Sequence, residues 1–183
     1  MRFYFYLKNL RLVDVIGFIP ITIITFIFGS KILGLIYNIE TVFFVILLMF
    51  IYLIFSLSIN NYFDRDNDKN STKIKKNPIS SGHISKNEGL AISIFVALFG
   101  LITCVYAFQN YIVYLYFIFL LNAFLYSWKF KGTPIVDLIS HGIYMLALFT
   151  IPALMPINSS RVIPGLRGIP LVITTTSLLA VFV

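Results

Sequence analysis

The stretch that decides the fold is TVFFVILLMFIYLIFSLSI, residues 41–59, and the polar stretch NNYFDRDNDKNSTKIKKNPISSGHIS, residues 60–85, follows it at once. The first stretch carries no charge and is long enough to cross the hydrocarbon core of a bilayer as a helix. Of the 183 residues, 59% are hydrophobic and only 11% are charged, whereas ordinary soluble domains contain about 25% charged residues. These features predict an integral membrane protein.

Six apolar segments of similar length predict an all-α fold, a polytopic transmembrane bundle of about six spanning helices. They cover residues 15–37, 41–59, 90–108, 111–128, 135–155 and 169–183. Only a short polar link separates the third segment from the fourth, which predicts a helical hairpin. Residues 1–183 show no soluble domain or internal repeat and are expected to form a single transmembrane domain. The N-terminus has no small-residue cleavage site, so we expect no removed signal peptide.

The cations are distributed unevenly among the loops. If the N-terminus is cytoplasmic, eleven of the 14 Lys and Arg residues fall on the cytoplasmic side, and only Lys31, Arg161 and Arg167 do not. This bias predicts a multi-pass protein of the cell membrane with residues 59–85 in the cytoplasm. Because the cations lie between spanning segments, we expect membrane lipids as their partners and no nucleic acid.

Four oxygen-bearing side chains follow the second apolar segment. If the helix continues, Asn60, Asp64 and Asp68 lie on one face, Asn61 lies beside them, and Asp66 points elsewhere. A row of carboxylate and amide oxygens is suited to Mg²⁺, which binds through one or two carboxylates together with phosphate oxygens. The alternative is a solvated turn where a membrane helix meets water. The pattern therefore leaves both a metal site and a simple helix end open.

Two other known motifs that bind metal or phosphate do not match this stretch. An EF-hand loop starting at Asp64 would need glycine at Lys69 and glutamate at Lys75. Enzymes that transfer phosphatidyl groups from CDP-linked lipids share the D-x-x-x-D spacing, but they carry an upstream D-G-x-x-A-R stretch that this chain lacks before Asp64.

A basic segment follows the acidic one and contains Lys69, Lys73, Lys75 and Lys76 before a turn with Pro78. Lysine is a compact point charge suited to phosphate. Cations beside a magnesium site at a membrane face are what a lipid diphosphate would require. The alternative is that the lysines only anchor the loop and attract anionic headgroups.

Asn60-Asn61-x-x-Asp64-x-x-x-Asp68, followed by NPISSGHIS, resembles the first aspartate-rich motif and the R-P-[LI]-x-S-G turn of UbiA-type intramembrane prenyltransferases. The family pattern is N-D-x-x-D-x-x-x-D, so Asn61 replaces an aspartate, and Asn77 stands where arginine is usual. An asparagine still offers an oxygen ligand, but the loss of one negative charge would weaken metal affinity.

A second cytoplasmic stretch, YSWKFKGTPIVD, extends this resemblance. Tyr126, Lys129 and Lys131 resemble the family's Y-S-x-x-K-R-type loop, which faces the prenyl diphosphate. Asp137 and His141 lie one turn apart in the predicted fifth helix, and ionisable residues within a membrane segment are functional hypotheses. Asp137 could instead cap that helix, and His141 could be a hydrogen-bonded interior residue. The KGTPIVDLISH pattern is also loosely similar to the branch of the family that prenylates carotenoids.

The resemblance implies Mg²⁺-dependent transfer of a prenyl group from a prenyl diphosphate to a lipophilic acceptor such as a quinone precursor, a lipid or a carotenoid. The implied metal ligands are Asn60, Asp64 and Asp68. The implied catalytic residues are Asp64, Asp68, Tyr126, Lys129 and Lys131. The implied substrate-binding residues are Asn60, Asn61, Lys73, Lys76, Ser81, Asp137 and His141.

One part of the family pattern has no counterpart in the sequence. Family members have about nine spanning helices and a second aspartate-rich motif, yet Asp137 is the last acidic residue here. We therefore expect a truncated chain, the N-terminal two-thirds of such an enzyme, which need not be active as given. The alternative from another class is a non-enzymatic membrane protein, such as a small transporter or cation-binding subunit. It predicts polar residues near mid-membrane, whereas the acids here lie mainly at the interface.

Overall fold

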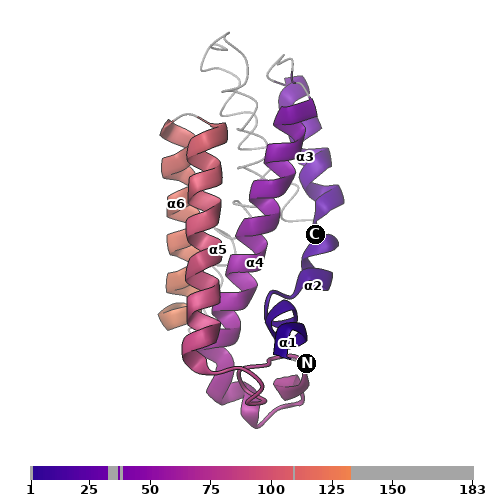
Figure 1. The fold of residues 1–183 in the computed structure, drawn as a ribbon. Coiled ribbons are helices and arrows are strands. Elements are labelled where there is room, and N and C mark those ends of the chain that lie inside the picture. Colours follow the sequence, from indigo (N-terminus) through magenta and orange to yellow (C-terminus); the bar gives the residue numbers. More distant parts are fainter. Residues whose placement is uncertain (1, 33–36, 38, 109, 133–183) are drawn as a thin grey trace.

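The computed structural model describes residues 2–32, 37, 39–108 and 110–132, and this part is helical without strands. The longer helices lie side by side, and a loop joins two of them at one end (Figure 1). Its helices are α1 (Arg2–Asn9), α2 (Leu12–Ile16), α3 (Ile19–Ile32), α4 (Ile39–Lys69), η1 (Thr72–Lys75), α5 (Lys86–Ala107), α6 (Asn110–Leu125) and the π-helical turn η2 (Tyr126–Phe130).

Helix α4 is the centre of the bundle, and it begins in the apolar segment and ends in the polar one. Its 31 residues contain neither proline nor glycine, so nothing in the sequence interrupts the backbone ladder. Of the most apolar 18-residue stretch of α4, 56% is buried inside the protein, whereas the buried share of the corresponding stretch of α5 is 17%. The prediction that the helix continues from residue 59 through the acidic row is therefore confirmed.

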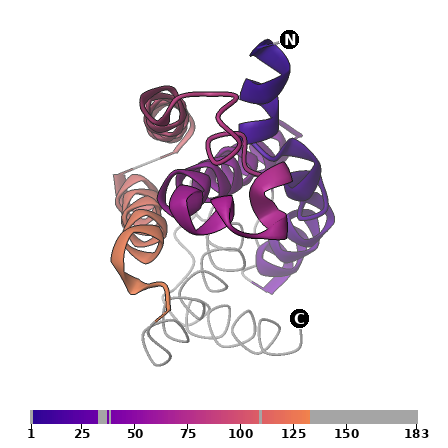
Figure 2. The ribbon, with the colours of Figure 1, turned by 90° about the horizontal axis from the view of Figure 1, so that it is seen from below.

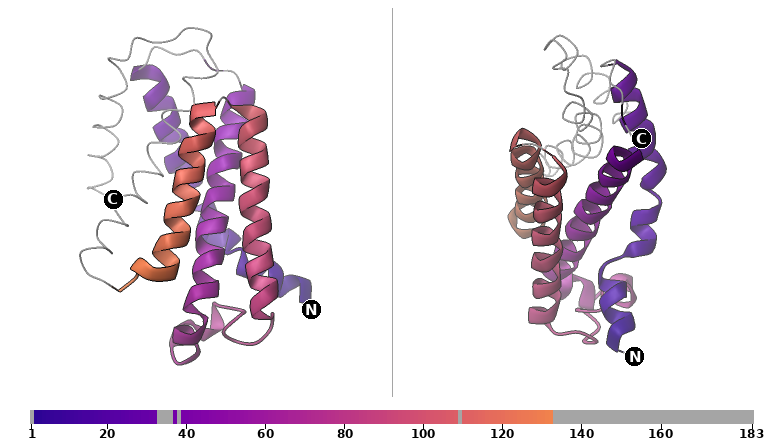
Figure 3. Two further views of the ribbon diagram at one scale, coloured as in Figure 1. Left: turned by 90° about the vertical axis from the view of Figure 1, so that its left-hand side faces the viewer. Right: turned by 45° about the horizontal axis from the view of Figure 1, so that its top comes forward.

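Helices α5 and α6 form the predicted hairpin and lie beside α4 (Figure 3). Gly100 of α5 allows a close approach, because a Cβ there would lie 2.5 Å from the Tyr116 hydroxyl oxygen and 2.9 Å from Cγ2 of Ile51. The buried Tyr116 hydroxyl in turn donates a hydrogen bond to the Leu48 carbonyl, at 3.3 Å. On the outer face of α5, large apolar side chains such as Phe95 and Ile102 are exposed, as expected for a surface that faces lipid.

The first apolar segment, predicted as one span over residues 15–37, contains α3 and begins at a bend. The helices Arg2–Ile16 and Ile19–Lys31 meet at an angle of 50°. Pro20 explains the break, because its ring lacks an N–H and would clash with the Ile16 carbonyl in a continuous helix. A second break occurs at Arg11, whose φ of 51° is left-handed. The N-terminal part thus folds as three short helices along α4 (Figure 1).

Three helices of the described part are long and apolar enough to cross a membrane, or four if the bent pair forms one span. The predicted segments 135–155 and 169–183 lie outside the described residues. The predicted count of about six spans therefore stays a prediction, while the helical membrane fold is confirmed for the part that the structure describes.

The connection between α4 and α5 closes the polar end of the bundle and lies beside α1 (Figure 2). It contains η1, a turn in which Gly82 has a φ of 75°, and Ser85, which begins α5 with a capping box to Glu88. Phe5 of α1 stacks on His83 of this connection, with ring centroids 3.8 Å apart. The segments predicted to share one side of the membrane thus lie at one end of the molecule.

Candidate active site

A polar cavity of about 370 Å³ lies at this end of α4. Acid and amide groups from α4 form one wall, and residues from three other segments, four of them cations, form the rest. The lining residues are Arg11, Asn60, Asn61, Asp64, Asp68, Thr72, Lys73, Lys76, Asn77 and Lys131. The cavity therefore brings together residues that are far apart in the sequence. Arg11 and Lys131, for example, are 120 positions apart.

The wall from α4 has the spacing that the sequence predicts. Asn60, Asp64 and Asp68 all line the cavity, and Asn60 Nδ2 donates to Asp64 Oδ2 at 2.8 Å. Asp66 lies on another face, where it forms ion pairs with Arg65 and Lys69, at 3.2 and 3.1 Å. The prediction that Asp66 points away from the row is confirmed, so only two carboxylates of the described residues face the cavity.

Asn77 holds the connection against α4. Its side chain is only 1% exposed. Its Nδ2 donates to Asp68 Oδ2 at 3.0 Å and to the Asn61 carbonyl at 2.8 Å. Its Oδ1 accepts from the amides of Ile79 and Ser80 in the turn that follows. One amide group therefore positions the Asp68 carboxylate and the loop that carries the lysines.

The Asn61 side chain connects the same wall to α1. Its Nδ2 donates to the Asn9 carbonyl at 3.2 Å, and both residues are buried. Asn61 still lines the cavity, in the position where the family pattern has an aspartate. An amide suits this position physically, because it can donate to the α1 backbone and a carboxylate cannot.

Lys131 is the cation in direct contact with the acidic row. Its Nζ forms an ion pair with Asp64 Oδ2 and donates to Asn60 Oδ1 at 3.2 Å. Lys73, Lys76 and Arg11 also line the cavity, so four cations face two carboxylates. This excess of positive charge favours an anionic ligand, and the contact of Lys131 with Asp64 shows that the carboxylate attracts a cation.

Arg11 and Thr72 are lining residues that the sequence did not indicate, and Arg11 is the charged one. Its guanidinium pairs with Asp14 through Nη2 and Nε, each 2.6 Å from Oδ2. The pair and the left-handed backbone of Arg11 belong to the same tight turn between α1 and α2. The i, i+3 spacing of opposite charges was visible in the sequence, but its position against the α4 wall depends on how α1 packs.

Other residues implied by the resemblance lie outside the cavity lining. Ser81 lies in the turn, where its Oγ donates to the Asn77 carbonyl at 3.2 Å. Lys129 is exposed on η2, and Tyr126 is half-buried at the start of the same turn. Asp137 and His141 lie outside the described residues.

The donor set fits a hard divalent cation better than a softer metal. Within the described residues no group of three His, Cys, Asp or Glu side chains could hold a metal ion. Asp64 and Asp68, with the amide oxygen of Asn60, supply one or two carboxylates, which is the usual protein contribution to a Mg²⁺ site that is completed by phosphate and water.

Comparison with known proteins agrees with this description. The sequence model of the UbiA prenyltransferase family matches residues 18–182, and the chain therefore belongs to that family. A UbiA homolog from Archaeoglobus fulgidus, solved with bound DMAPP and Mg²⁺, has the same fold, with a TM-score of 0.71 and 21% sequence identity. The match covers 95% of this chain and 60% of that protein. No curated protein is significantly similar to the chain.

We predict that Asn77→Ala loosens the connection after α4. Removal of the buried amide takes a hydrogen-bond partner from the Asp68 carboxylate and from the turn amides of Ile79 and Ser80, which costs about 1–3 kcal/mol. The expected result is a lower Tm in detergent and faster tryptic cleavage at Lys73, Lys75 and Lys76. Asn67→Ala, an exposed position on α4, is the matched control and should change neither. Equal Tm and cleavage rates for both variants would contradict the role of Asn77.

Proposed function

We propose that the polar cavity binds the diphosphate group of a prenyl diphosphate, and that the protein transfers the prenyl group to a lipophilic acceptor within the membrane. The observation that carries this proposal is the composition of the cavity. Two carboxylates and two amides form one wall, and four cations face them at the end of a membrane helix. Membership of the UbiA family and the DMAPP and Mg²⁺ bound to the related structure support it.

Asp64 and Asp68, with Asn60, would hold Mg²⁺. When bound, the ion offsets the negative charge of the diphosphate. Lys131 lies against Asp64 and Asn60 and would exchange these contacts for phosphate oxygens when a cation binds there. The hydrogen bond that Asn77 Nδ2 donates to Asp68 Oδ2 keeps this carboxylate in place before any ligand arrives. Such preorganisation reduces the reorganisation that binding would otherwise require.

The transfer requires that an allylic C–O bond breaks and that its electron pair leaves with the diphosphate. Negative charge then grows on the leaving oxygen, and the cations that line the cavity, Lys73, Lys76, Lys131 and Arg11, would stabilise it. A nucleophilic atom of the acceptor forms the new bond to the allylic carbon and loses a proton. The prenyl chain, which is apolar throughout, would extend from the cavity toward the membrane interior.

The family resemblance also implies roles in catalysis or substrate binding for Tyr126, Lys129, Ser81, Asp137 and His141, and these roles are proposals too. The first three lie near the polar end but outside the cavity lining, and we propose that they contact the substrate only when it is bound. The basic residues that already line the cavity are the stronger candidates for the diphosphate.

We predict that Asp64→Asn and Asp68→Asn each reduce Mg²⁺-dependent diphosphate release by at least about 100-fold, because a neutral amide is a weaker ligand for a hard cation. The measurement uses labelled prenyl diphosphates and membranes that contain the protein. Asp66→Asn is the matched control, since Asp66 is two residues from each aspartate but lies outside the cavity. If Asp66→Asn lost as much activity as the other two, the assigned metal face would be wrong.

The two lysines of η1 allow a test of the basic wall. Lys73 lines the cavity, whereas Lys75 of the same turn does not. We expect Lys73→Gln to weaken binding of a non-hydrolysable prenyl thiodiphosphate by up to about fivefold, the range for an exposed charge pair, and Lys75→Gln to leave it unchanged. Equilibrium binding at constant ionic strength measures both. Equal losses would mean that the lysines act only through overall charge.

A further inference from the structure

Helix α1 has two faces with different surroundings. The inner face contacts the rest of the protein, through the Arg2–Glu88 ion pair at 2.9 Å, the hydrogen bond from the Tyr6 hydroxyl to Glu88 at 2.9 Å, and the stacking of Phe5 on the loop. The outer face exposes Phe3 and Tyr4, at 71% and 61%. Large apolar residues are thus exposed on a helix that is firmly attached, which is unusual for a surface that faces only water.

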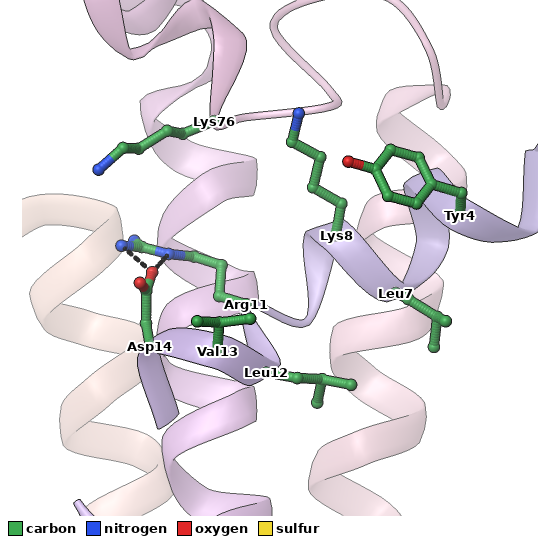
Figure 4. Close-up of a pocket in the computed structure, with 8 residues that line it drawn as sticks. All are labelled: Tyr4, Leu7, Lys8, Arg11, Leu12, Val13, Asp14 and Lys76. Carbon is green, nitrogen blue, oxygen red and sulfur yellow. Dashed lines mark hydrogen bonds and ion pairs between the residues drawn. The ribbon is translucent and has the colours of Figure 1, made fainter. Parts of the chain in front are cut away.

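A second cavity, of about 390 Å³, opens beside this outer face. Its lining is mainly apolar but carries three cations and one acid: Tyr4, Leu7, Lys8, Arg11, Leu12, Val13, Asp14 and Lys76. Figure 4 shows Lys8 and Lys76 on the side of the connecting loop, with Leu7 and Leu12 farther from it. The cavity therefore has a basic end and an apolar end.

The charges of this cavity do not cancel. Asp14 is already paired with Arg11. Lys8 Nζ lies over the Tyr4 ring, 5.9 Å from its centroid, and within the described part of the chain neither Lys8 nor Lys76 forms an ion pair with a carboxylate. Two ammonium groups thus face the cavity without a nearby counter-ion, so an anion would be attracted to its basic end.

The cavity lies at the level where the spanning helices end. Lys76 belongs to the connection between α4 and α5, and both helices are long and apolar enough to span the membrane. An amphipathic helix at this level, with aromatic and apolar residues outward and lysines near the headgroups, is the arrangement of interfacial membrane helices. Charge and position both match one kind of ligand, which joins an anionic headgroup to an apolar chain.

We propose that this cavity binds an anionic phospholipid of the surrounding leaflet. The phosphate lies near Lys8 and Lys76, and an acyl chain runs along Leu7, Leu12 and Val13. The proposal does not depend on prenyl transfer. Because Arg11 and Lys76 line both cavities, the bound lipid would lie directly beside the polar cavity.

Lipid binding can be measured by native mass spectrometry of the full chain in detergent, with phosphatidylglycerol and phosphatidylcholine of identical acyl chains. We expect phosphatidylglycerol to bind at least about fivefold more tightly, since each basic residue near a membrane surface contributes about that factor. Lys8→Gln should remove about fivefold of the affinity for phosphatidylglycerol and a smaller factor of that for phosphatidylcholine, because the choline group offsets the charge of its phosphate. Lys8 lines only this cavity, so its loss does not alter the polar one.

Lys75→Gln is the control for overall charge, because Lys75 is exposed at the same end but lines neither cavity. Retained binding of phosphatidylcholine also reports that the Lys8 variant is folded. Equal affinity for the two lipids would overturn the proposal, and so would equal losses in the Lys8 and Lys75 variants. Displacement of phosphatidylglycerol by inorganic phosphate at the same free concentration would also overturn it, because the apolar wall would then contribute nothing.

Discussion

The uninterrupted hydrogen-bond ladder of α4 is the constraint on which the polar cavity depends. Backbone groups in lipid have no water to bond with, so the chain must be helical there, and without proline or glycine the helix has no cause to stop at the interface. It continues for a further ten residues beyond Ile59, to Lys69. The apolar part is anchored by its neighbours, and the polar part therefore presents Asn60, Asp64 and Asp68 in one fixed row.

Carboxylates fixed in a row on one helix face repel each other. The other residues of the site offset this repulsion. Lys131 comes from the end of η2, Lys73 and Lys76 from the connection after α4, and Arg11 from the turn before α2. Asn77 and Asn61 supply neutral donors that tie the loop and α1 to the row. The charges of the cavity remain unbalanced toward positive, which is the property that a diphosphate with its metal ion requires.

The local parts of this arrangement could be predicted from the sequence. The continuation of α4, the shared face of the i, i+4, i+8 residues, the outward direction of Asp66 and the α5–α6 hairpin all follow from helical periodicity or segment length. The family resemblance correctly indicated the UbiA fold. The bend before α3 was not predicted, although Pro20 was a visible signal, because a length criterion for apolar segments does not detect a bend.

The contacts between distant segments could not be predicted in the same way. Arg11 enters the cavity because α1 packs against the connection through Phe5 and against α4 through Asn9, and no periodic pattern specifies that docking. Lys131 and Lys129 are two positions apart, and only Lys131 contacts the acidic row, because the π-helical turn η2 orients it. Which of these two lysines contacts the acidic row thus depends on the backbone geometry of one turn.

The central claim is that one cavity holds the diphosphate and its metal ion together. An experimental structure with Mn²⁺ in place of Mg²⁺ and a prenyl thiodiphosphate, with the metal identified by anomalous scattering, tests it most directly. The account predicts an anomalous peak at the Asp64 and Asp68 carboxylates, with phosphate oxygens between that peak and Lys73, Lys76 and Lys131. A peak away from both aspartates, or a diphosphate bound outside this cavity, would contradict it.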